Sequence, residues 1–224
     1  MALTLVIGNK NYSSWSFRPW IAMRVAGIPF EEIVVPLYEP GSRERILGFS
    51  PAGKVPVLLD GDIRVWESLA ILDYLAEQYP QAGLWPSDRM ARAHARAIAA
   101  EMHAGFLALR RHCPMNMWRP VMARELPDEA ADNVRRIEAI WTDCRGRFSQ
   151  SGPFLFGAFG AADAMYAPIV SRLQTYGVVV GPTVHAYMQA VMGLPAWAAW
   201  RAAALQESWI MANNEVDWPA VPRM

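Results

Sequence analysis

The amino-acid sequence predicts two domains, an N-terminal α/β domain followed by an all-helical C-terminal domain. In the first part, short apolar runs rich in β-forming residues alternate with segments of helical spacing. The second part consists of long segments rich in Ala, Arg and Met, with apolar residues at helical spacing. Between them, the stretch PQAGLWPS is rich in residues that break regular structure. We therefore assign residues 1–80 to the first domain, 81–87 to a linker and 88–224 to the second domain.

The first domain is expected to begin with a strand, a helix and a second strand. The strands are apolar runs rich in β-forming residues, and the helix shows apolar residues at helical spacing before a terminating glycine. The expected elements are a buried strand at 3–7, a helix that opens within 12–20 and ends at Gly27, a strand at 30–35, and a weakly indicated short helix around 39–47.

A β-hairpin and a third helix complete the first domain. Two apolar runs, 55–59 and 63–66, flank Asp60-Gly61-Asp62, and Asp-Gly between strand-like runs is a strong hairpin signal. Ser68 then occupies the position of an N-cap, and apolar residues at helical spacing continue to Tyr79. The sheet is therefore expected to be mixed, with the final hairpin antiparallel.

The start of this hairpin and the start of its helix both leave backbone groups unpaired. Pro56 removes a ladder donor, so it marks the beginning or the edge of a strand, where an extended peptide could bind. Glu67 and Ser68 precede a helix whose first N–H groups favour an anion. A ligand that carries a carboxylate fits there, although plain helix capping is the alternative.

The second domain is expected to contain helices only, before an irregular tail. Gly160 serves as the N-cap of one helix, and Asp163 is expected to cap that helix and not to react. The tail at 213–224 carries Trp218 and two prolines. The expected helices cover 88–111, 128–148, 163–176 and 194–207.

The composition makes several classes of function improbable. The formal net charge is zero, with 21 basic and 21 acidic residues, so nothing indicates nucleic acid or an anionic membrane as a partner. No run reaches the roughly eighteen apolar residues of a membrane span, and the N-terminus lacks the pattern of an export signal. Cys113 and Cys144 form no metal-binding pattern. We expect a soluble cytoplasmic protein without a metal.

Two blocks of the first domain carry a family resemblance. They are Ser50-Pro51-x-Gly53-Lys54-Val55-Pro56-Val57-Leu58 and Glu67-Ser68-Leu69-Ala70-Ile71-x-x-Tyr74-Leu75. At this spacing, both resemble the glutathione-binding half of the cytosolic glutathione S-transferase (GST) family. The resemblance implies the GST fold, a thioredoxin-like α/β domain followed by an all-α domain, and the division of the chain agrees with it from end to end.

The resemblance also implies a place for each part of glutathione, the expected co-substrate. In the family the Val55–Pro56 bond is cis, and the residue before the proline, here Val55, pairs its backbone with the cysteinyl part. Glu67 and Ser68 hold the γ-glutamyl carboxylate. Lys54 is a candidate for the glycyl carboxylate, and a solvated surface lysine is an equally good interpretation of it.

The segment Ser13-Ser14-Trp15-Ser16-Phe17-Arg18 resembles the SSCxxR motif of zeta-class GSTs, with Trp15 in place of the cysteine. A free thiol with a pKa of about 8.5 is only slightly ionised at neutral pH, so the protein must stabilise the thiolate. The zeta-class alignment assigns this task to Ser13, and the theta-class spacing assigns it to Ser14; we rank Ser13 first. Tyr12 is a third candidate, and capping of the helix is the alternative role for both serines.

In the GST family the second substrate lies between the domains, against the first long helix of the helical domain. Here that region supplies an apolar wall rich in methionine, which is typical of a site for a small hydrophobic electrophile. Packing in the helical core is the alternative, above all for Phe106. The candidate wall residues are Trp15, Met102, His103, Phe106, Met115, Met117 and Trp118.

These features together favour a GST that activates the glutathione thiol with a serine hydroxyl. The resemblance further implies a homodimer. Two alternatives remain. One is a non-catalytic glutathione-binding or protein-interaction member of the fold, because a fold does not establish a function. The other is a glutathione-dependent isomerase of the maleylacetoacetate type, against which Trp15 argues because it replaces the zeta-class cysteine.

Overall fold

The computed structural model describes residues 2–149 and 152–216, and its first part is built on a four-stranded mixed sheet in the order β2-β1-β3-β4. β1 pairs in parallel with β2, and the antiparallel hairpin of β3 and β4 joins the sheet through β1. The predicted strands and the Asp-Gly hairpin are confirmed. The strands are β1 (Leu3–Ile7), β2 (Phe30–Val34), β3 (Val57–Asp60) and β4 (Ile63–Trp66).

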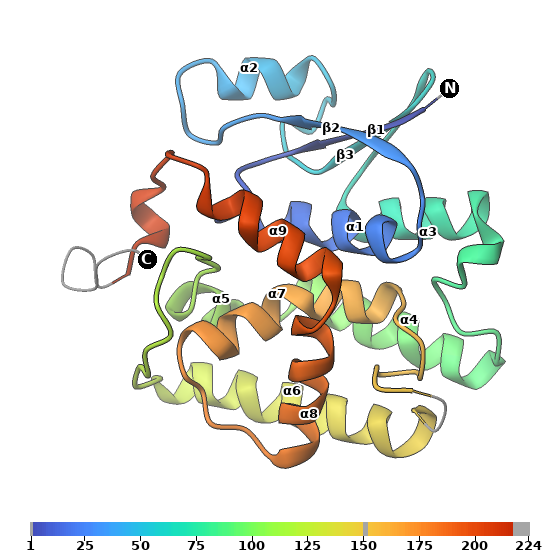
Figure 1. Ribbon diagram of the computed structural model, residues 1–224, viewed down its shortest axis with the longest axis vertical. Coiled ribbons are helices and arrows are strands. Elements are labelled where there is room, and N and C mark those ends of the chain that lie inside the picture. Colours follow the sequence, from blue (N-terminus) through green and yellow to red (C-terminus); the bar gives the residue numbers. More distant parts are fainter. Residues whose placement is uncertain (1, 150–151, 217–224) are drawn as a thin grey trace.

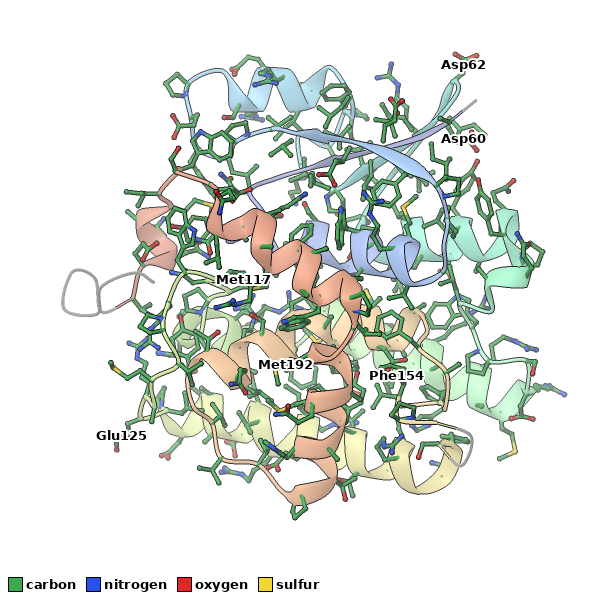
Figure 2. All side chains as sticks on the ribbon, viewed as in Figure 1. Asp60, Asp62, Met117, Glu125, Phe154 and Met192 are labelled. Atoms are coloured by element: carbon green, nitrogen blue, oxygen red, sulfur yellow. The ribbon has the colours of Figure 1, made fainter. Side chains whose placement is uncertain are left out.

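Helices cover both faces of this sheet (Figure 1). α2 (Ser42–Leu47) lies on one face, while α1 (Ser14–Val25) and α3 (Ser68–Gln78) lie on the other, between the sheet and the helical part. Asp60 and Asp62 mark the tip of the hairpin, away from the helical part (Figure 2). The faces of α1 and α3 that point away from the sheet therefore pack against the second domain.

The second part is helical, with α7 at its centre. Nearly every residue of α7 is buried, and it packs against α1 of the first part as well as α4. One hydrophobic cluster runs from Leu5 in β1 to Trp200 in α9, so both parts share a core. The helices are α4 (Arg89–Ala104), α5 (Leu107–His112), α6 (Asp128–Phe148), α7 (Ala161–Thr175), α8 (Pro182–Met192) and α9 (Pro195–Leu205), with 3₁₀ turns at Pro80–Ala82 and Ala212–Asn214.

The prediction of one continuous helix over 88–111 is wrong, because the chain breaks between α4 and α5. Phe106 has a φ of 61°, which is the left-handed region that interrupts a helix. Gly105 sits so close to the preceding turn that a Cβ would lie 2.8 Å from the Glu101 carbonyl oxygen. The break redirects α5, and with it the side chains that face the N-terminal domain.

Two further differences concern helix starts. Ser68 is the first residue of α3, and Glu67 occupies the N-cap position without a side-chain capping bond, so the prediction of Ser68 as N-cap is wrong. α8 was not expected from the sequence, because Gly-Pro, here Gly181-Pro182, is typical of a turn. In the structure that proline occupies the first helical position, where its missing N–H costs nothing.

The predicted start of α7 is confirmed. Gly160 is its N-cap, and the Asp163 carboxylate accepts hydrogen bonds from the N–H groups of Gly160 and Leu155. Burial raises the pKa of Asp163 to about 6. Trp218, assigned to the irregular tail, lies outside the described residues. No described helix is long and apolar enough to cross a membrane.

Candidate active site

A cleft of about 1110 Å³ opens at the N-terminal ends of α1 and α3. The segment 53–56 before β3 and the start of α2 line one side. The other side is lined by residues of α4, α5 and α7, together with Met211 and Asn214 from the C-terminal segment. Both parts of the molecule therefore contribute to the cleft, which is the usual position for a ligand site.

Ser13 is the N-cap of α1, and its side chain is occupied by that role. Its Oγ accepts from the Ser16 backbone N–H at 3.4 Å and donates to the Ser16 Oγ at 2.8 Å. The Ser16 Oγ in turn accepts from the Gly8 N–H at 3.1 Å. Although Ser13 lines the cleft, its hydroxyl belongs to a network that joins the end of β1 to the start of α1.

Ser14 also lines the cleft, and its hydroxyl has a different partner. Its Oγ accepts a hydrogen bond from Nη2 of Arg172 at 3.2 Å, across 158 residues of sequence. Among the described residues, no acceptor takes the proton of the Ser14 hydroxyl. A hydroxyl that accepts from a guanidinium keeps its own proton for another acceptor, and a ligand in the cleft can supply one.

Tyr12, the third candidate for thiol activation, turns its hydroxyl toward the C-terminal segment. That hydroxyl forms a hydrogen bond with the carboxylate of Glu215. The ring packs edge-on against Trp118, with centroids 5.7 Å apart. The tyrosine therefore borders the cleft while its polar end serves a contact within the protein.

The segment 53–56 presents backbone to the cleft. The Val55–Pro56 bond is cis, as the family resemblance implied. Lys54, Val55 and Pro56 line the cleft, and the pairing of β3 with β1 and β4 begins only at Val57. The backbone of Val55 thus lies beyond the sheet ladder, next to the cleft, where it can pair with an extended ligand.

At the start of α3, the side chains of Glu67 and Ser68 point in different directions. Glu67 lines the cleft, and its φ of 67° is uncommon for a residue with a side chain. Such strain costs on the order of 1 to 3 kcal/mol and is concentrated at ligand sites. Ser68 is fully buried, and its Oγ accepts from Nη1 of Arg18 at 3.4 Å. Its side chain therefore points into the interdomain core, away from the cleft.

Comparison with known proteins places this geometry in a family. The model described as "Glutathione S-transferase, N-terminal domain" matches residues 12–78. The model described as "Glutathione S-transferase, C-terminal domain" matches residues 127–203, and the two together cover more than half of the chain. This chain belongs to the glutathione S-transferase family. The resemblance stated from the sequence is confirmed, and so is the GST fold.

Individual relatives come from two branches of the GST family. Glutathione S-transferase theta-1 of Bos taurus is 32% identical over 68% of this chain and 61% of its own length. Maleylacetoacetate isomerase of Pseudomonas aeruginosa is 33% identical over 48% of this chain and 52% of its own. A probable maleylacetoacetate isomerase of Caenorhabditis elegans is 38% identical over 43% and 45%. The chain thus spans about half the length of these curated relatives.

A solved structure supports the fold over nearly the whole length of this chain. It is a glutathione transferase homologue from Burkholderia gl BGR1 with bound glutathione, and it superposes with a TM-score of 0.70 at 23% identity. The match covers 93% of this chain and 100% of that one. A diazinon-metabolizing glutathione S-transferase of Bombyx mori gives a TM-score of 0.72 at 17% identity, covering 92% and 98%.

The predicted apolar wall for a second substrate is wrong in most of its residues. Trp15 and His103 do line the cleft. The other five are buried and absent from its lining: one lies on the buried face of α4, and four lie at or after the break that follows it. Those five residues are Met102, Phe106, Met115, Met117 and Trp118. The sequence had left core packing open as their alternative role.

Two arginines and a proline take their place. Arg110 of α5, Pro114 and Arg172 of α7 line this side of the cleft. Burial, followed by the charge of Arg110, lowers the pKa of Arg172 to about 10, and burial also lowers the pKa of Arg110. Both guanidinium groups remain protonated at neutral pH. This wall is therefore cationic.

Trp15 connects the two sides of the cleft. The guanidinium carbons of Arg18 and Arg110 lie 4.1 and 4.7 Å from the centroid of its ring, and the ring packs edge-on against His103 at 5.2 Å. His103 Nε2 lies 3.6 Å from a Glu67 oxygen. Burial, then the charge of Arg18, lowers the pKa of His103, so its imidazole is neutral at pH 7.

Sequence reasoning missed both cleft arginines. The sequence predicts one helix through His103 and Arg110, whereas the structure places them on separate helices with the break at Gly105 and Phe106 between them. Arg172 left no signal either, because only the packing of α7 against α1 brings it to Ser14.

The described cysteines and acidic residues offer no further reactive site. Burial raises the pKa of Cys113 to about 11 and that of Cys144 to about 12, so both thiols stay protonated at neutral pH. Among the described residues, no group of three or more His, Cys, Asp or Glu could hold a metal ion.

Proposed function

We propose that this GST-family chain is a glutathione transferase in which Ser14 activates the thiol of glutathione. The hydrogen bond from Arg172 to the Ser14 Oγ carries the proposal. Because the guanidinium occupies an acceptor site of the hydroxyl, the hydroxyl proton is available to a thiolate in the cleft. Ser13, ranked first from the sequence, is assigned the capping of α1, since its hydroxyl already bonds Ser16.

The energy required of this site is moderate. Lowering a thiol pKa of about 8.5 by about two units corresponds to roughly 2.7 kcal/mol of preferential interaction with the thiolate. A hydrogen bond to a charged sulfur, the N-terminus of α1 and the nearby charge of Arg172 each stabilise an anion at this place. Together they are sufficient without a cysteine nucleophile or a metal.

The remaining parts of glutathione are assigned to the other residues that line the cleft. We assign the cysteinyl backbone to Val55, whose own backbone lies beyond the sheet ladder. The γ-glutamyl group is assigned to Glu67 and the first N–H groups of α3, where Ser68 contributes its backbone because its side chain faces Arg18. Lys54 is assigned to the glycyl carboxylate. The thiol then lies toward the N-terminus of α1.

In the reaction, the thiol proton passes to solvent and the thiolate attacks an electrophilic carbon. A carbon–sulfur bond forms while the bond to the leaving group breaks, and that group departs with its electron pair. Ser14 and Arg172 hold the sulfur while the cationic wall faces the second substrate. Proximity and thiolate stabilisation supply the acceleration.

The test is conjugation of glutathione to a chloro-dinitrobenzene, followed by the absorbance of the product, together with calorimetric titration of glutathione. We expect saturable turnover well above the uncatalysed rate, and binding at one site per chain. Binding without turnover would favour the non-catalytic alternative. Absence of both would restrict the relationship to the fold.

A second candidate is a glutathione-dependent isomerase, favoured by the two maleylacetoacetate isomerase relatives. In an isomerase the thiolate adds to a cis double bond and leaves again after rotation, so glutathione is not consumed. Incubation with a cis-enoyl diacid, followed by product analysis, distinguishes the two reactions. Isomerised product with unchanged glutathione would support the isomerase.

We also propose a homodimer in the cytoplasm, as is typical of the GST family. Both cysteines are buried and unpaired, which fits a reducing compartment. Light scattering of the purified protein should give twice the mass of the 25.0 kDa chain. A single-chain mass at micromolar concentration would contradict the dimer.

A further inference from the structure

The second-substrate wall of the cleft carries positive charge without a matching carboxylate. Arg110 and Arg172 line the cleft, and Arg18 is buried beneath Trp15 close to both. Burial, then the charges of Arg110 and Arg172, lowers the pKa of Arg18, and burial, then the charge of Arg110, lowers that of Arg172. Glu67 is the carboxylate that acts on this cluster, through Arg18. No carboxylate of the described residues acts on Arg110 or Arg172.

The three charges have different neighbours. Arg18 lies beneath Trp15, is nearly fully buried, and bonds Ser68. Arg172 bonds Ser14, so the thiolate of the proposed transferase lies next to it. Arg110 is the remaining cation, and it lines the cleft beside Pro114. A thiolate and Glu67 balance two of the three charges and leave one.

Arg110 is held firmly in this position. Its guanidinium donates to the carbonyls of Met102, His103 and Gly105, which the break between α4 and α5 releases from helical bonding. It also lies 4.7 Å from the centroid of the Trp15 ring. A preorganised cation loses little side-chain entropy when it binds an anion, which makes it a good recognition group.

A second observation concerns Arg172. The residue is 5% exposed, and its buried Nε has no hydrogen-bond partner among the described residues. Its Nη1 donates to the carbonyls of Arg110 and Cys113, which brings it against α5. Arg172 therefore places a second, nearly buried positive charge at the cleft, held there by these carbonyls and by Ser14.

From these contacts we infer that the electrophile is an anion, which presents a carboxylate to Arg110 and Arg172. The inference rests on the proposed transferase function and replaces the neutral hydrophobic electrophile expected from the sequence. Glutathione brings its own carboxylates to the opposite walls, at Lys54 and at the start of α3. The substrate class is therefore a small electrophile with a carboxylate near its reacting carbon.

The test compares a chloro-dinitrobenzoate with its methyl ester, each rate divided by its uncatalysed rate with glutathione. We expect the normalised kcat/KM of the carboxylate to exceed that of the ester by about tenfold or more, as one charged contact allows. In Arg110→Gln this preference should disappear, and Arg110→Lys should restore part of it. Arg111→Gln is the matched control, because Arg111 is its neighbour on α5 and lies outside the cleft lining.

A second measurement covers the case in which Arg110→Gln does not fold. Benzoate and benzamide are titrated by calorimetry into the wild-type complex with glutathione. We expect benzoate to bind about tenfold more tightly, with an affinity that falls as salt rises. Equal binding of the two, or an ester preferred over its carboxylate, would overturn the inference. Failure of both electrophiles to react while benzoate binds would instead refute the proposed transferase function alone.

A raised KM for glutathione in Arg110→Gln, with the preference between the two electrophiles intact, would also overturn the inference. That result would assign Arg110 to the co-substrate. A loss confined to the carboxylate electrophile would support the inference, because it separates the second-substrate wall from the glutathione walls.

Discussion

The two walls of the cleft are built in different ways. At the α1 wall, Ser13, Ser14 and Trp15 are neighbours in sequence, and the cap that Ser13 forms fixes all three at once. At the opposite wall, Arg110 reaches the cleft beyond a broken helix, and Arg172 comes from a helix 158 residues away from Ser14. Contiguous sequence therefore determines one wall, and tertiary packing determines the other.

This difference extends to the electrostatics. The α1 wall contributes hydroxyl groups and a helix N-terminus, which polarise a ligand without carrying a full charge. The opposite wall contributes two desolvated guanidinium groups. A glutathione thiolate would lie where the two walls meet, at the bond between Arg172 and Ser14. Variants of Ser14 and of Arg172 can therefore test how much each wall stabilises the thiolate.

The largest expected effect comes from Ser14→Ala. Removal of one preorganised donor to a charged reacting atom costs about a hundredfold in rate in comparable sites. We expect kcat/KM with a chloro-dinitrobenzene to fall by about this factor, while calorimetry still shows glutathione binding. Ser13→Ala should lose far less. If Ser13→Ala were the inactive variant and Ser14→Ala the active one, the assignment of the two serines would be reversed.

Arg172→Gln tests the other partner of the same bond. Loss of the cation should raise the pKa of the bound glutathione thiol by about one unit, a tenfold change in the ionisation equilibrium. The thiolate is the reactive form, so the pH profile of kcat/KM should move to higher pH. Ultraviolet absorbance of the thiolate in the complex measures the shift directly. With Arg111→Gln as control, an unchanged thiol pKa would exclude the proposed role of Arg172.

The same contrast explains what the sequence could predict of the site. The serine pair, the cis proline and Glu67 follow from short motifs, so their presence at the cleft was predictable. The side chain of Ser68 was not, because its orientation depends on the buried Arg18 from another helix. The N-cap position of Glu67 could not be predicted either, because a serine before an apolar helix is the commoner cap.

Much of the fold was predictable for the same reason. Strand runs, the Asp-Gly turn and the Gly160 cap are local signals. The break at Gly105 and Phe106 lies inside a longer run of helix-forming residues, where one glycine is a weak signal. The carbonyls that it frees are satisfied by Arg110 of α5. A predicted apolar wall became core because no sequence pattern distinguishes a helix face against a cleft from one against another helix.

Ser13→Ala should show its effect in stability. Loss of an N-cap costs about 1 kcal/mol, because one N–H at the start of α1 loses its acceptor. We expect the free energy of unfolding in urea to fall by about this amount, and Ser13→Gly to lose only a few tenths. An equal loss in both variants would indicate that the hydrogen bond from the Ser13 hydroxyl to the Ser16 Oγ is the important contact, and not the capping bond from the Ser16 N–H.

An effect of similar size is expected at Glu67, where strain and ligand binding can be separated. Glu67→Gly removes the carboxylate and the strain of a φ of 67°, whereas Glu67→Ala removes the carboxylate only. The glycine variant should therefore unfold in urea with a free energy about 1 kcal/mol above that of the alanine variant, after the entropy of glycine in the unfolded chain is offset. Calorimetry should show the same loss of glutathione affinity in both, since the carboxylate is gone from each. If the glycine variant alone lost affinity, the strained backbone itself, and not the carboxylate, would be what holds the α3 N-terminus ready for the ligand.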